Sequence, residues 1–60
     1  MEQYLKQIGM KLDAMVERVA LYRSWVMDAA TAEEAALFQK MAEETQGFAN
    51  FLFKTALELI

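Results

Sequence analysis

The sequence lacks cysteine, histidine and proline altogether, and it contains only two glycines. Without cysteine the chain forms neither a disulfide nor a thiolate metal site, and without histidine the usual zinc sites are excluded as well. Strand-rich folds need frequent turn residues, which this sequence does not supply. These absences favour an all-helical protein that holds no metal and no cofactor.

The charge of the chain is low and negative. Six basic and nine acidic residues give a net charge of −3, whereas a nucleic-acid binder concentrates basic side chains to displace counterions from the phosphates. The uncharged stretches are far shorter than the ~18–20 residues of a membrane-spanning helix. The N-terminal residues show no basic segment followed by an apolar one, so we expect no signal peptide. Together with the lack of cysteine, these features predict a cytoplasmic protein that binds neither nucleic acid nor membrane.

The sequence contains few of the side chains that enzymes use for catalysis. A catalytic site would have to use carboxylates, lysine, tyrosine or the single serine, Ser24. The adjacent pairs Glu33/Glu34 and Glu43/Glu44 diverge by about 100° on a helix, so their carboxylates do not converge on one substrate atom. A glycine-rich phosphate loop is also absent. We therefore expect a protein that is not an enzyme.

Apolar residues make up 57% of this 60-residue chain. The length allows one small domain, residues 1–60. Burial of apolar surface contributes on the order of 90 kcal/mol, and ordering the chain costs about the same amount. Chains with so small a margin usually depend on a disulfide, a metal or a partner subunit. Because the first two are excluded, a second subunit is the expected source of stability.

The first half of the sequence has a sustained heptad pattern of apolar residues. These residues recur at alternating spacings of three and four: Leu5, Ile8, Leu12, Met15, Val19, Tyr22 and Val26. Such spacing places all of them on one stripe of a helix. The pattern predicts a single helix from about residue 2 to residue 28.

The apolar pattern changes register after residue 28. Continued at the same spacing, the first stripe would become polar, because it would reach Glu33 and Lys40. The apolar residues of the second half instead form a different stripe: Phe38, Met41, Ala42, Thr45, Phe48, Ala49, Leu52, Ala56 and Leu59. A second helix from about residue 32 to residue 59, after a turn at about residues 29–31, explains the shift.

A helix-start signal stands at this boundary. Thr31 followed three residues later by Glu34 matches the capping box, in which the threonine side chain accepts a hydrogen bond from the N3 amide. Glu33 and Glu34 also place negative charge near the positive end of the helix dipole. Asp28 is a competing cap, which would move the boundary by two to three residues. Because a short connection makes consecutive helices antiparallel neighbours, the predicted fold is an all-α helical hairpin.

The larger members of both stripes are expected to fill the space between the helices. This predicted hairpin core contains Leu5, Ile8, Leu12, Met15, Val19, Tyr22, Val26, Phe38, Met41, Phe48, Leu52 and Leu59.

Both helices have more apolar surface than one partner helix can cover. The surplus residues form a candidate dimer or partner surface: Met10, Leu21, Trp25, Met27, Leu37, Phe51, Phe53, Leu57 and Ile60. A contiguous apolar patch in water usually marks an interface. Two hairpins related by two-fold symmetry would bury these residues in a four-helix bundle, so we expect a homodimer.

These expectations lead to a small, non-enzymatic regulator, inhibitor or chaperone-like adaptor. It would bind another protein through an apolar helix face and act as a homodimer. We expect it to be a phage or plasmid accessory protein. Two alternatives stay open: a structural subunit of a larger assembly, and an RNA-binding hairpin dimer. The second alternative rests on four basic residues of the first helix, which four acidic residues balance.

Overall fold

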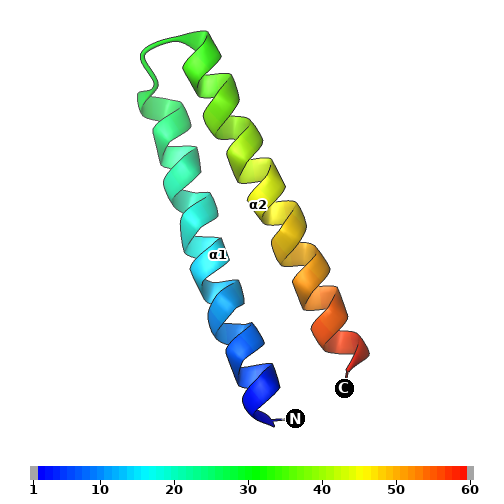
Figure 1. The fold of residues 1–60 in the computed structure, drawn as a ribbon. Helices are drawn as coiled ribbons and strands as arrows, with labels where there is room; N and C mark the ends of the chain where they lie inside the picture. Colours follow the sequence, from blue (N-terminus) through cyan, green and yellow to red (C-terminus); the bar gives the residue numbers. More distant parts are fainter. Residues whose placement is uncertain (1, 60) are drawn as a thin grey trace.

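Two antiparallel α-helices of equal length make up the fold. The computed structural model describes residues 2–59, in which α1 spans Glu2–Asp28 and α2 spans Ala32–Glu58. Each helix contains 27 residues. Figure 1 shows them side by side, joined by a short turn at one end, with both chain ends at the other. The prediction of an all-helical chain with two helices packed as a hairpin is confirmed.

The face of α1 that meets α2 is the stripe of heptad-spaced apolar residues. Ile8 and Val19 are each only 5% exposed, and the other five members of the stripe are half-buried. Spacings of three and four keep these side chains on one side of the helix from its first turn to its last. The stripe therefore holds together a thin rod whose backbone extents are 46 × 15 × 9 Å.

The face of α2 that meets α1 is lined with small side chains. Its seam alternates alanine with larger residues: Ala35, Phe38, Ala42, Thr45, Ala49, Leu52 and Ala56. Ala42 and Ala49 are 1% and 5% exposed, and the other members are half-buried. The distance between two packed helices depends on the side chains at their contact. Alanine at every seventh residue therefore lets the backbone of α2 come close to α1.

Two residues of the predicted core are exposed, one within α2 and one directly after it. Phe48 and Leu59 were expected between the helices, yet they are 56% and 40% exposed. Phe48 precedes Ala49 by one residue, which is about 100° around the helix, so the alanine faces α1 and the ring lies at the flank. Leu59 follows the last residue of α2, at the open end of the hairpin, where few side chains of α1 remain to cover it.

The turn between the helices closes through a threonine cap. The Thr31 backbone is extended (φ −134°, ψ 159°), and its hydroxyl accepts a hydrogen bond from the Glu34 amide at 3.1 Å. Its carbonyl accepts a further bond from the Ala35 amide at 3.0 Å. Before the turn, the Ala29 amide donates to the Val26 carbonyl at 3.4 Å, a tight closure that ends α1. Within residues 2–59 no residue has a positive φ, so the turn needs no glycine.

Candidate interaction surface

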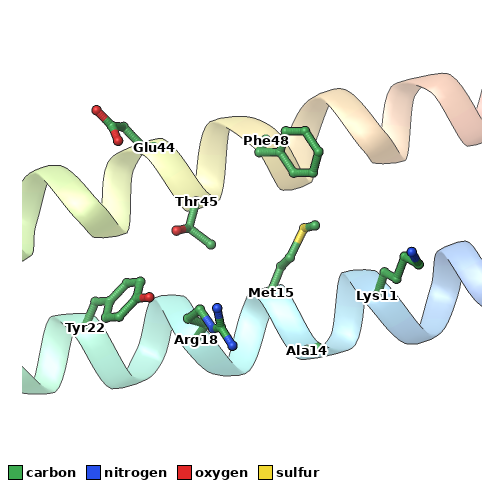
Figure 2. A pocket seen from close by; sticks show the side chains of 8 residues that line it. All are labelled: Lys11, Ala14, Met15, Arg18, Tyr22, Glu44, Thr45 and Phe48. Carbon is green, nitrogen blue, oxygen red and sulfur yellow. The ribbon is translucent and has the colours of Figure 1, made fainter.

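A groove runs between the two helices along one face of the hairpin. It has a volume of about 540 Å³ and is lined by Lys11, Ala14, Met15, Arg18, Tyr22, Glu44, Thr45 and Phe48. Figure 2 shows Met15 and Thr45 projecting into the space between the helices, whereas Glu44 points away from α1. The floor of the groove is therefore the seam of the hairpin, and its rims carry exposed and charged side chains.

Three aromatic rings cluster on this face near the turn. The Trp25 ring centroid lies 5.3 Å from that of Tyr22 and 5.5 Å from that of Phe38, at interplanar angles of 52° and 62°. Tilted and edge-to-face rings attract each other beyond the area that they bury. A second, smaller groove here is lined by Trp25, Phe38, Asp28 and Glu34. Because Tyr22 lines the first groove and Trp25 the second, both grooves belong to one surface, called the groove face below.

The groove face carries a row of large apolar side chains. Helix geometry places there six that are 38–64% exposed: Tyr4, Leu21, Trp25, Leu37, Phe48 and Phe51. Residues seven apart share one side of a helix, which aligns Tyr4 with Lys11, and Leu37 with Glu44. Trp25 was expected to be surplus surface alone. That expectation is half right, because its ring also packs on Phe38 of α2 while remaining 38% exposed.

In the middle of the groove face, away from Asp28 and Glu34 at the turn, the basic and acidic side chains lie on different helices. The groove is bordered by Lys11 and Arg18 from α1 and by Glu44 from α2. Glu58 lies 14 residues beyond Glu44, in the same column of α2. The middle of the face is therefore basic along α1 and acidic along α2.

The other predicted surface residues lie away from the grooves. Helix geometry places three of them, at 53–86% exposure, on the opposite face: Met27, Phe53 and Leu57. The exposed Val16, which was not predicted, lies on the same face. Met10, 64% exposed, lies on the outer side of α1. Ile60 lies outside the described residues. The predicted partner surface is thus divided between two faces, with polar residues such as Glu43 and Asn50 interrupting the one opposite the grooves.

Two exposed residues, Tyr4 and Val16, were missed by the sequence reasoning. They are 53% and 60% exposed. Tyr4 was detectable, because it stands seven residues before Lys11 and 21 residues before Trp25, in one column of α1. Val16 follows Met15 of the seam directly, and no spacing marks it as surface.

The groove face presents exposed apolar and charged side chains. Among residues 2–59 no three acidic side chains gather in a way that would hold a metal ion. Over the same residues, neither helix combines the length and the apolar character needed to cross a membrane. Apolar area flanked by charges is the composition found at protein interfaces. Comparison with protein-family models, curated proteins and solved structures finds no significant match.

Proposed function

We propose that this chain is a non-enzymatic protein-binding module that works as a homodimer. The main support for this proposal is the solvent-accessible surface area of the hairpin. The hairpin exposes 4859 Å², whereas a folded monomer of 6.9 kDa exposes about 4,000 Å². The surplus of about 900 Å² is close to the ~800 Å² that each partner contributes to a standard protein interface. A second subunit covering one face would bring the exposed area to the usual value.

The apolar nature of the exposed side chains supports the same proposal. Among the described residues, twelve large apolar side chains are 38–86% exposed, while only four residues are buried. Soluble monomers rarely keep a large contiguous apolar patch in water. Because the exposed residues lie on two faces, one face is available for a second copy and the other for a different protein.

Within this proposal the chain acts by covering the surface of its partner. An amphipathic helix would lay its apolar side chains into a groove of the partner, as in helix-in-groove recognition. Such an action suits a regulator, an inhibitor or a chaperone-like adaptor and needs no catalytic group. The proposal includes a cytoplasmic location, which the lack of cysteine supports.

One observation favours a structural role as the second candidate. The backbone of the hairpin extends over 46 Å in its longest direction and only 9 Å in its shortest. Rods with apolar sides on two faces can associate side by side without closing, which would make the chain a structural subunit of a larger assembly.

Light scattering over a series of chain concentrations separates these candidates. A closed homodimer gives twice the chain mass of 6.9 kDa at every concentration above its dissociation constant. Its melting temperature also rises with concentration, because association stabilises the folded chains. A mass that keeps growing with concentration favours the structural subunit instead. A folded monomer at the highest concentration contradicts the homodimer.

A further inference from the structure

We infer that the groove face binds the groove face of a second copy, with both turns at the same end of a four-helix bundle. This inference rests on the proposed homodimer. It adds which surface the two copies share and how they are oriented.

The groove face is favoured over the opposite face as the dimer interface because its exposed apolar side chains are larger. Four of its six large exposed residues are aromatic, Tyr4, Trp25, Phe48 and Phe51, and two grooves lie among them. Aromatic side chains are enriched at the centres of protein interfaces, where they fill hollows in the partner. The groove face therefore offers both the anchors and the hollows that a symmetric contact requires.

Two orientations are compatible with a two-fold axis. If the axis runs along the rod, both turns lie at one end, and α1 of each copy packs against α2 of the other. If the axis is perpendicular to the rod and the faces still meet, the turns lie at opposite ends, and each helix packs against its own equivalent.

The charges in the middle of the groove face distinguish these orientations. Arg18 lies ten residues before the end of α1, and Glu44 lies twelve residues after the start of α2. At a rise of about 1.5 Å per residue, their distances from the turn differ by only about 3 Å. With both turns at one end, Arg18 therefore faces Glu44 of the second copy, and the two-fold axis repeats this pairing.

The opposite orientation brings like charges together. Glu44 lies one residue from the midpoint of α2, so it would face its own equivalent. Lys11 and Arg18 lie four and three residues on either side of the midpoint of α1, so Lys11 would face Arg18 of the second copy. Like charges opposed in an interface weaken association, because the interface removes the water that screens them.

Two acidic residues, Asp28 and Glu34, count against the favoured orientation. They line the small groove near the turn, so four acidic side chains would gather where the two turns meet. These side chains lie at the end of the bundle, in contact with water. Salt there screens the repulsion between exposed charges that are more than about 10 Å apart. The pairs in the middle of the interface therefore outweigh the repulsion at its end.

Charge reversal tests the pairing. Arg18→Glu alone and Glu44→Arg alone should each raise the dissociation constant of the dimer at least about tenfold in analytical ultracentrifugation, because each change acts twice per dimer. The combined variant Arg18→Glu/Glu44→Arg should return to within about threefold of the natural sequence, because the pair is restored. Arg23→Glu, the same change on the opposite side of α1, is the matched control and should leave the constant unchanged. Circular dichroism checks that every variant stays helical.

A distance measurement tests the orientation independently. The chain has no cysteine, so Ala30→Cys in the turn gives a single attachment point for a nitroxide label. Neighbouring helix axes lie about 8–10 Å apart. Turns at the same end should therefore give a distance between the two labels of under about 30 Å in pulsed electron paramagnetic resonance. Turns at opposite ends give a distance near the 46 Å length of the rod.

The results of these two experiments distinguish the orientation of the two copies from the existence of the homodimer itself. A dimer with the long distance, or a dimer that tolerates both single charge reversals, overturns the orientation and leaves the homodimer standing. A folded natural chain that sediments as a monomer overturns both. The short distance together with rescue by the combined variant supports the inference.

Discussion

Replacing Ala42 by leucine tests whether small side chains set the distance between the helices. Ala42 is 1% exposed, so three added carbons find no open space unless the helices separate. If they fitted without strain, their burial would stabilise the fold by about 0.8 kcal/mol each. Overpacking a close contact instead costs about 1–3 kcal/mol, because side chains leave their preferred rotamers or the backbones move apart. We expect the second outcome, a loss of about 2 kcal/mol.

Urea unfolding followed by far-ultraviolet circular dichroism measures this loss. The midpoint should fall while the slope with urea stays constant, which indicates a change of stability alone. In thermal unfolding, each kcal/mol should lower the midpoint by about 4–8 °C for a domain of this size. Every variant must be compared at one chain concentration, because association contributes to the stability of a dimer.

The matched control is Ala36→Leu, the same change at an exposed position of α2. Its stability should stay within about 0.5 kcal/mol of the natural sequence. If Ala42→Leu proves as stable as Ala36→Leu, the helices do not meet through a close alanine seam, and the explanation for the exposure of Phe48 fails with it.

Three further predictions address the glycines, the cap and the aromatic cluster. A Cβ added at Gly9 or Gly47 meets nothing within 4 Å, so alanine at either helical position should stabilise by about 0.5–1 kcal/mol in thermal unfolding. A loss at either position would show that another chain lies over that glycine. Thr31→Ala should destabilise by about 0.5–2 kcal/mol, whereas Thr31→Ser keeps the capping hydroxyl and most of the stability; equal losses in both would argue against the cap. Phe38→Ala should cost less than the ~3–5 kcal/mol of a fully buried ring and should weaken the near-ultraviolet circular dichroism of Trp25. An unchanged near-ultraviolet signal would contradict the ring cluster.

The hairpin could be predicted because its first helix carries an unambiguous pattern. Between Leu5 and Val26 the stripe consists of large apolar side chains, so spacing and hydrophobicity indicate the same face. The second helix is different, because apolar residues cover about half of its circumference. Hydrophobicity alone ranks Phe48 above Ala49 as a core residue. The structure places the alanine inside, because close approach of two backbones favours the smaller side chain.

The division of the partner surface into two faces could not be predicted in the same way. It depends on how far each helix is rotated about its own axis, and one residue of error in α2 changes that rotation by about 100°. The alanine seam sets this rotation in the structure. Once the seam is recognised, the columns of Lys11 and Arg18 on α1 and of Glu44 on α2 follow from spacing alone.

The turn at residues 29–31 makes the hairpin tolerant of variation at one point. Because no residue there adopts a positive φ, the backbone of the turn is not tied to glycine or asparagine, and within it only Thr31 has a capping side chain. Doubling the length of a flexible connection costs only about 0.6 kcal/mol of loop-closure entropy. Inserted residues would project from the end of the rod, beyond the seam that holds it together. The turn is therefore the place where sequences of this design could diverge in length while their helices stay in register.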